Sequence, residues 1–124
     1  MKTNKHIAIV GSRAFQNYEQ LKKEVLNVYR YGDEFVSGGA IGADSMGQRL
    51  AKELGITITV VYPNWTPNGV YDHGAGFKRN KIIVEKSDIV LAFYAQGKFQ
   101  QGGTSNTIHW ARELDVPYLE FEEY

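Results

Sequence analysis

Short apolar runs alternate with amphipathic helical patterns along the chain. Runs rich in β-branched and aromatic residues predict strands at residues 7–10, 34–37, 56–62, 88–93 and 117–121. The first and fourth runs are almost continuously apolar, which is typical of strands buried on both faces. Apolar residues at helical spacing predict helices over residues 17–32, 43–55, 75–86 and 104–114.

This alternation of strand and helix predicts the fold class. Right-handed crossovers place successive strands parallel to one another. We therefore predict a Rossmann-like three-layer α/β sandwich, with a five-stranded parallel sheet in the order 3-2-1-4-5 and helices on both faces. The first and fourth strands lie side by side in this order. Ligands bind such sheets at the carboxyl ends of the strands, at the point where the order reverses.

Composition narrows the class of protein. The 124 residues suit a single domain, residues 1–124, with a hydrophobic core. Basic and acidic residues number 14 each, so no net field attracts polyanions and nucleic acid is a disfavoured partner. The chain has no cysteine, which excludes disulfides and thiol chemistry. No apolar run approaches the about 18 residues that span a bilayer, so we expect a cytoplasmic protein without membrane contact.

Three turns rich in small residues define a candidate binding site. Glycine lets the backbone approach a ligand closely, and the free N–H groups of a following helix favour an anion. Because the turns share one edge of the predicted sheet, they predict a pocket for phosphate or ribose phosphate. The candidate contacts are Gly11, Ser12 and Arg13 in the first turn, Gly38, Gly39, Ala40, Gly42 and Asp44 in the second, and Gly102, Gly103, Thr104, Ser105 and Asn106 in the third.

Two arginines favour an anion at these turns. Arg13 follows a buried strand, where its forked guanidinium suits a bidentate contact with phosphate. Arg79, with Asn80 beside it, lies at the start of the third helix. The second turn has Ala40 where a dinucleotide fingerprint needs glycine, and no turn ends in Gly-Lys-Ser/Thr. We therefore predict no redox cofactor and no NTP hydrolysis, and the scattered histidines predict no metal site.

A long connection, residues 62–76, precedes the third helix. Loops of this length in a small domain are often functional. Its Trp65, Tyr71 and His73 are candidate contacts for a nucleobase, by stacking or capping, and its glycines permit closure as a lid. The alternative is that Trp65 and Tyr71 only pack the loop down.

Five short motifs follow one another along residues 7–119. They are Gly-Ser-Arg, Ser-Gly-Gly-Ala-x-Gly-Ala-Asp, a proline with a tryptophan, Ala-Gly-x-x-Arg-Asn, and Gly-Thr-x-x-Thr-Ile. Together they resemble the SLOG superfamily, most closely its small stand-alone YspA-like branch and more distantly the LONELY GUY-type phosphoribohydrolases and the DprA proteins. The resemblance implies a site for nucleotide-derived ligands across the turns, with Arg79 and Gly103-Thr104 among its contacts.

The chain departs from the hydrolases of this superfamily at the third turn. Those enzymes carry one or two glutamates after Gly-Thr, where Asn106 and Thr107 stand here. Cleavage of an N-glycosidic bond needs a carboxylate that stabilises the sugar cation or activates water. Asp44 and Asp72 are the candidate acids, and Asp44 also has a structural alternative, which is to complement a helix dipole. Whether the chain is an enzyme therefore stays open.

The leading hypothesis is a protein that binds a nucleotide or a nucleotide-derived small molecule, as a sensor or by sequestration. One alternative is an N-glycosidase that acts on nucleoside monophosphates or NAD derivatives. A second alternative is single-stranded DNA binding, against which the zero net charge argues. By analogy with small Rossmann-like proteins, we also expect a homo-oligomer, a dimer or larger.

Overall fold

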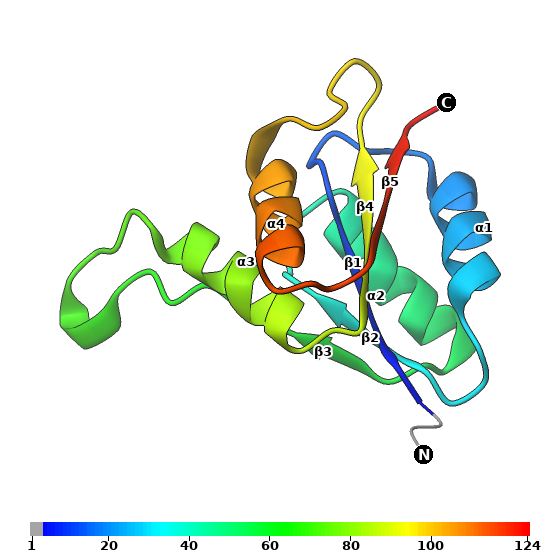
Figure 1. Ribbon diagram of the computed structural model, residues 1–124, viewed down its shortest axis with the longest axis horizontal. Helices are drawn as coiled ribbons and strands as arrows, with labels where there is room; N and C mark the ends of the chain where they lie inside the picture. The colour runs from blue at the N-terminus through cyan, green and yellow to red at the C-terminus, as the bar shows by residue number, and fades with distance from the viewer. Residues whose placement is uncertain (1–3) are drawn as a thin grey trace.

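A computed structural model describes residues 4–124 as a sheet covered by helices on both faces (Figure 1). The strands are β1 (His6–Gly11), β2 (Glu34–Ser37), β3 (Ile58–Val60), β4 (Ile89–Tyr94) and β5 (Tyr118–Glu122). The helices are α1 (Tyr18–Val28), α2 (Ala43–Leu54), α3 (Ala75–Glu85) and α4 (Gly102–Glu113), with a short 3-10 turn, η1 (Pro67–Gly69). No helix in this part of the chain is long and apolar enough to cross a membrane.

All neighbouring strands are parallel, in the order β3-β2-β1-β4-β5. The predicted Rossmann-like fold and strand order are therefore confirmed. β1 pairs with β4 along its length, from Ile7 opposite Ile89 to Gly11 opposite Phe93. The carboxyl ends of these two central strands consequently lie together at one edge of the sheet, where the strand order reverses.

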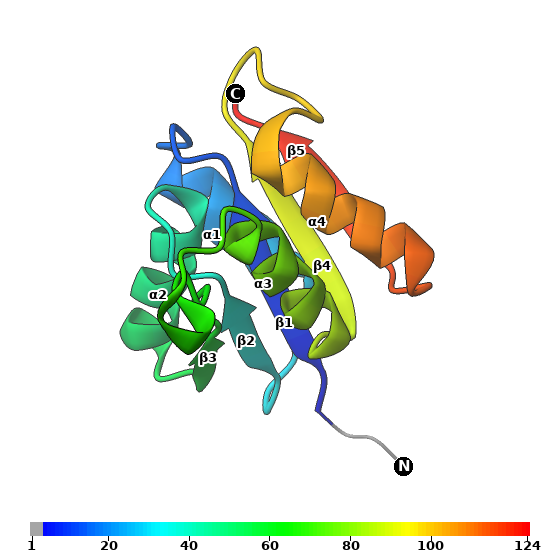
Figure 2. The same cartoon turned by 90° about the vertical axis from the view of Figure 1, so that its left-hand side faces the viewer.

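The central strand β1 divides the core into two halves because its side chains alternate. Ile7 and Ile9 belong to the core under α1 and α2. Ala8 and Val10 belong to the core under α3 and α4, on the other face of the sheet (Figure 2). All four side chains are buried, which explains why the strand reads as a continuous apolar run.

Three elements differ from the sequence-based boundaries by more than one residue. α1 ends at Val28, before the predicted end at residue 32. β3 is shorter than the predicted strand over residues 56–62, because β2 is short and its pairing ends with Ser37 opposite Val60. α4 begins at Gly102, two residues before the predicted start. The third glycine turn therefore forms the first turn of α4 instead of a loop in front of it.

Candidate functional site

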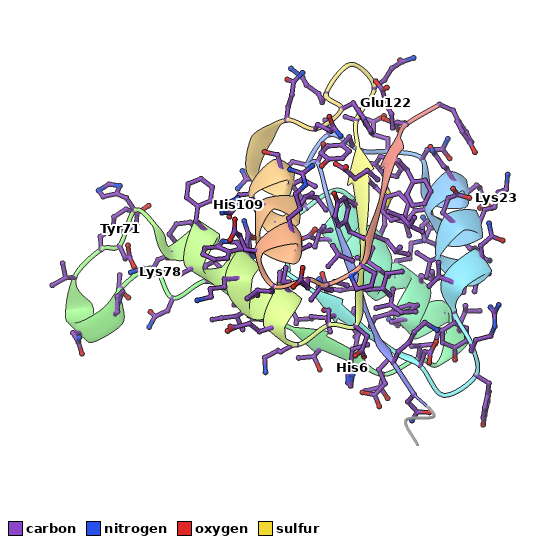
Figure 3. The ribbon with its side chains drawn as sticks, viewed as in Figure 1. His6, Lys23, Tyr71, Lys78, His109 and Glu122 are labelled. Carbon is purple, nitrogen blue, oxygen red and sulfur yellow. The ribbon has the colours of Figure 1, made fainter. Side chains whose placement is uncertain are left out.

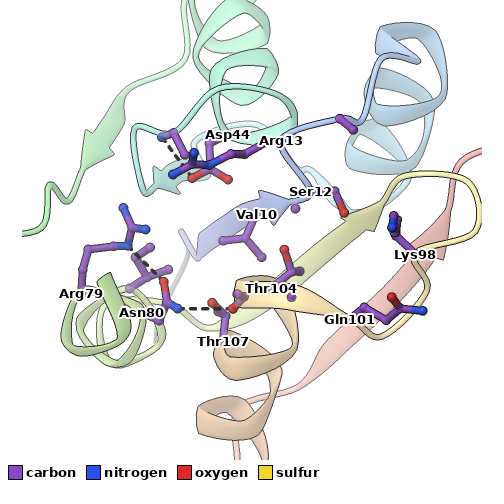
Figure 4. Close-up of a pocket in the computed structure, with 16 residues that line it drawn as sticks. Val10, Ser12, Arg13, Asp44, Arg79, Asn80, Lys98, Gln101, Thr104 and Thr107 are labelled. Carbon is purple, nitrogen blue, oxygen red and sulfur yellow. Dashed lines mark hydrogen bonds between the residues drawn. The ribbon is translucent and has the colours of Figure 1, made fainter. Parts of the chain in front are cut away.

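A cavity of about 520 Å³ lies at the carboxyl ends of β1 and β4 (Figure 4). All three predicted turns contribute to its wall, together with the start of α3 and the connection between β4 and α4. Its lining residues are Val10, Gly11, Ser12, Arg13, Ala14, Ala40, Asp44, Arg79, Asn80, Ile83, Lys98, Gln101, Gly102, Gly103, Thr104 and Thr107. The sheet topology thus brings segments from both halves of the chain to one site.

The first turn is fixed to the end of β4. The backbone N–H of Ser12 donates to the carbonyl of Phe93 (2.8 Å), and the Ser12 hydroxyl accepts from the N–H of Ala95 (3.1 Å). A Cβ at Gly11 would lie 2.1 Å from the carbonyl oxygen of Phe93, so only glycine permits this approach. Arg13 follows directly and extends along the cavity toward Asp44 (Figure 4).

The second turn folds tightly against the first. Gly42 has a φ of 80°, and a Cβ there would lie 2.3 Å from the carbonyl oxygen of Ser12. A Cβ at Gly38 would lie 2.8 Å from Oδ2 of Asp44. Of the predicted contacts in this turn, Ala40 and Asp44 line the cavity, whereas Gly38, Gly39 and Gly42 do not. Gly38 and Gly42 shape the turn, where any side chain would collide with its surroundings.

Asp44 is a buried carboxylate in the cavity wall, with 5% of its surface exposed. Its Oδ2 accepts from the N–H of Ala40 (3.3 Å), and its carbonyl accepts from the Ser37 hydroxyl (3.1 Å). Burial raises the pKa of Asp44 to about 6, although neighbouring backbone N–H groups and the Arg79 guanidinium oppose the shift. Asp44 therefore holds the second turn through its hydrogen bonds and also lines the cavity.

Arg79 and Asn80 connect the second and third turns. The Arg79 Nη1 donates to the carbonyl of Gly38, and its Nε donates to Oδ1 of Asn80 (3.0 Å). The Asn80 amide in turn donates to the carbonyl of Gly103 (3.3 Å) and to Oδ1 of Asn106 (3.1 Å). The start of α3 therefore holds the second turn and the start of α4 in register.

The two guanidinium groups of the cavity repel one another. Burial lowers the pKa of Arg79, Asp44 raises it, and the positive charge of Arg13 lowers it further. Arg13 forms no ion pair with any residue in the range 4–124. An anion placed between these groups would relieve the repulsion, so this end of the cavity suits a phosphate.

The third turn contributes Gly102, Gly103 and Thr104 to the cavity. Ser105 and Asn106 do not line it. The Ser105 hydroxyl donates back to the carbonyl of Gly102 (2.6 Å), and Asn106 accepts from Asn80. These two predicted contacts are thus engaged in holding the helix start.

Six lining residues were not among the sequence-based candidates: Val10, Ala14, Ile83, Lys98, Gln101 and Thr107. Val10 and Ile83 look like ordinary core residues in the sequence, so no pattern distinguishes them. Lys98 and Gln101 come just before the third glycine turn. A cation beside a predicted phosphate-binding turn could have identified Lys98 as a candidate contact. Thr107 lies one helical turn after Thr104 on α4, which is visible only once the helix start is known.

The aromatic side chains of the long connection lie away from the cavity. Trp65 stacks on Tyr71, with ring centroids 6.0 Å apart and planes 8° apart, and Tyr71 contacts His73 edge-on at 4.6 Å. The segment projects from the body beyond α3 (Figures 1 and 3). None of the three lines the cavity, and their mutual contacts match the alternative in which the loop packs on itself.

Asp72 also lies outside the cavity. Its carboxylate pairs with Lys78 (2.6 Å) and accepts from the N–H of Gly74 (2.8 Å), and the hydrogen bond from Lys78 lowers the pKa of Asp72. Of the two candidate acids, only Asp44 therefore lines the cavity. Within residues 4–124, no cluster of three or more acidic or histidine side chains is arranged to hold a metal ion.

Comparison with known proteins gives one family match and several structural neighbours. Residues 1–73 match the family model of the DNA recombination-mediator protein A. The structure of DNA processing protein A from Helicobacter pylori, described for its single-stranded DNA binding mode, is 19% identical with a TM-score of 0.72. It is matched over 93% of this chain, which spans 64% of that protein. None of the curated protein sequences compared with the chain matches significantly.

Two further solved structures share the fold. The structural-genomics target TM1055 is 19% identical, with a TM-score of 0.66 over 92% of this chain and 72% of its own. DNA processing protein A from Streptococcus pneumoniae is 16% identical, with a TM-score of 0.60 over 93% of this chain and 58% of its own. At these identities the likeness supports the fold.

These matches correct one expectation from the sequence. The zero net charge led to the prediction that nucleic acid is a disfavoured partner, yet the family model is that of a DNA recombination mediator, and one structural neighbour is described for binding single-stranded DNA. Net charge averages over the whole surface, whereas Arg13, Arg79 and Lys98 concentrate cations at one cavity. The formal charge therefore does not argue against nucleic acid.

Proposed function

This chain belongs to the DNA recombination-mediator protein A family, within the SLOG superfamily, and on that premise we propose that its cavity binds the phosphate and sugar of a nucleotide. In this proposal residues 1–124 form one nucleotide-binding domain that senses or sequesters its ligand. Assignment to the YspA-like branch stays a prediction from the five sequence motifs.

The pair of arginines at the cavity carries the proposal. Arg13 has no ion-pair partner in the described part of the chain. Its positive charge lowers the pKa of Arg79, so the two guanidinium groups interact electrostatically. The carboxylate beside them, Asp44, is already engaged with the backbone of the second turn. Two guanidinium groups held in this way suit the oxygens of one phosphate.

The rest of the cavity suits a nucleoside. Its volume, about 520 Å³, falls in the range of small-molecule sites. Val10, Ala14 and Ile83 supply apolar surface, and the hydroxyls of Ser12 and Thr104 supply polar groups for a sugar. The glycosidase alternative rests on Asp44 alone, because Asp72 lies outside the cavity.

Single-stranded DNA is the second candidate ligand. The family match and the H. pylori neighbour favour it. A strand would place one of its phosphates at the same arginines, and Lys81 of α3, which forms no ion pair with any residue in the range 4–124, is the candidate cation for a neighbouring phosphate. The two candidates therefore share the cavity and differ in how far the ligand extends from it.

Calorimetric titration with thymidine 5′-monophosphate and with oligothymidylates of increasing length separates the candidates. For a nucleotide site, we expect the monophosphate to bind and affinity to change little beyond two nucleotides. For a strand-binding surface, affinity rises with length, and its logarithm falls linearly with the logarithm of salt concentration. Absence of binding by every probe would contradict the proposal, and release of free base would support the glycosidase alternative.

Asp44 gives the protein a pH-dependent stability. Its folded-state pKa, about 6, lies above the usual value of 3.8. This group therefore favours folding most at low pH, where it is protonated in both states, and that contribution is lost as pH rises through 6. We expect the change to reach about 3 kcal/mol by pH 7.

The Asp44→Asn variant isolates this effect, because it cannot ionise and its amide oxygen still accepts from Ala40. Urea unfolding between pH 4 and pH 7 is expected to show the variant gaining stability relative to the natural protein as pH rises. A stability difference that stays constant over this range would contradict the assignment of a raised pKa to Asp44.

A further inference from the structure

We propose that the cavity holds two phosphate groups at once, one at Arg13 and Arg79 and one at Lys98. The inference rests on the proposed function and narrows its ligand class to nucleotides with a phosphate on either side of a sugar. A nucleoside 3′,5′-bisphosphate and two successive phosphates of a single strand share this chemistry.

The cations of the cavity are divided between two ends. Arg13 and Arg79 lie with Asp44 beside the second turn, whereas Lys98 lies beyond Ser12, in the connection between β4 and α4 (Figure 4). The cavity between them, about 520 Å³, is much larger than a single phosphate needs. A phosphate held by both guanidinium groups therefore leaves Lys98 free for a second anion.

Lys98 keeps an available charge although acidic residues lie close to its loop. Lys98 forms no ion pair with any residue of the described chain. On β5, Glu120 accepts from the Tyr94 hydroxyl (2.6 Å), and Glu122 accepts from the N–H of Gly97 (2.7 Å). These carboxylates hold the loop in place and do not neutralise the lysine.

The loop that carries Lys98 has a defined shape. The backbone N–H of Lys98 donates to the carbonyl of Ala95 (2.9 Å), and the Gln100 side chain donates to Glu120 (3.2 Å). Gly97 and Gln100 both adopt positive φ, 79° and 60°. The tight turns and the contacts from β5 fix the backbone at Lys98, which lowers the entropy lost when it binds an anion.

Hydroxyl groups lie between the two ends. The Ser12 hydroxyl accepts from Ala95, so its proton is free to donate. Thr104 is 8% exposed and its hydroxyl points into the cavity without a hydrogen-bond partner in residues 4–124 (Figure 4). Because the described chain has no buried side-chain oxygen without a partner, this hydroxyl is accessible from the cavity and can bond an oxygen of the ligand between its two phosphates.

The test compares thymidine 5′-monophosphate with thymidine 3′,5′-bisphosphate by calorimetry. We expect the natural protein to bind the bisphosphate about tenfold more tightly, which is the effect of one charge-assisted hydrogen bond. Lys98→Ala is expected to bring the ratio of the two affinities to about one, and Lys98→Arg to keep most of it. Lys52→Ala, which removes the same charge from the far end of α2, is the control that keeps the ratio.

Variants of Glu122, a positioning residue that accepts from the N–H of Gly97, give a second, independent test. Glu122→Ala removes the acceptor for Gly97 and is expected to lower the ratio of affinities. Glu122→Gln removes the same charge but keeps an acceptor oxygen, so it is expected to restore the ratio. Loss of the ratio in both variants would show that an acceptor oxygen for Gly97 does not preserve the second subsite, and it would overturn the positioning role.

The outcomes separate this inference from the proposed function. If the monophosphate binds but the bisphosphate gains nothing, the second subsite is wrong and the nucleotide site stands. If neither nucleotide nor a thymidylate octamer binds, both proposals fall. If a thymidylate octamer shows the Lys98 dependence and the bisphosphate does not, the two phosphates belong to a strand and not to a free nucleotide.

Discussion

Replacing Gly42 by alanine is expected to destabilise the fold by about 3 kcal/mol or more. Gly42 has a φ of 80°. A Cβ there would also lie 2.3 Å from the Ser12 carbonyl oxygen and 2.5 Å from that of Arg13. Both neighbours are backbone atoms, so they cannot rotate away, and the first and second turns must separate. Urea unfolding of the two proteins measures the difference.

Gly103→Ala is the matched control. A Cβ at Gly103 has no atom within 4 Å, and the residue lies in the first turn of α4. Alanine there is expected to change stability by about 1 kcal/mol or less, in the stabilising direction, because it favours the helix. Equal losses of stability in the two variants would show that the close contact between the first and second turns is not the reason that glycine is needed at position 42.

Replacing Arg79 by alanine is expected to weaken nucleotide binding about 100-fold. The variant loses a guanidinium from the cavity and also releases its hold on Gly38 and Asn80. Arg79→Lys keeps the charge but loses the planar fork, so we expect an intermediate loss of about tenfold. Calorimetry with thymidine 5′-monophosphate gives these ratios.

A second variant separates lost charge from a lost contact. Lys81 lies on the same helix, over the ring of Trp110 (5.0 Å) and outside the cavity. Lys81→Ala removes the same formal charge and is expected to leave binding of the monophosphate within about twofold. Circular dichroism must show that Arg79→Ala is folded, because the variant removes the Arg79 charge from beside the buried Asp44. Equal weakening by both variants would contradict a specific role for Arg79.

The fold was predictable because two patterns in the sequence have simple physical causes. Residues 7–10 read as a continuous apolar run because alternate side chains of β1 enter two different cores. The alternation of strand and helix then leaves few topologies for a parallel sheet. The length of β3 was overestimated. It depends on how far β3 pairs with β2, and the sequence of β3 itself carries no information about that pairing.

The site was predictable only where it consists of backbone turns. Three glycine-rich segments predicted the turns that contribute to the cavity wall, and Asn80 of α3 donates to the backbone of the third turn. Side chains were harder to place. Trp65 and Tyr71 carry the aromatic surface expected for a base, but the loop folds them against one another. Lys98 lines the cavity because β5, the last strand, holds its loop in place. The sequence around Lys98 does not predict this contact.

Nucleotide phosphate, in our proposal, binds at the three turns. Amide NMR of the labelled protein, titrated with thymidine 5′-monophosphate, tests it most directly. We expect the largest shifts at residues 11–14, 38–44 and 102–104, and their loss in Arg79→Ala. Shifts confined to residues 62–74, or none at any ligand concentration, would contradict the claim.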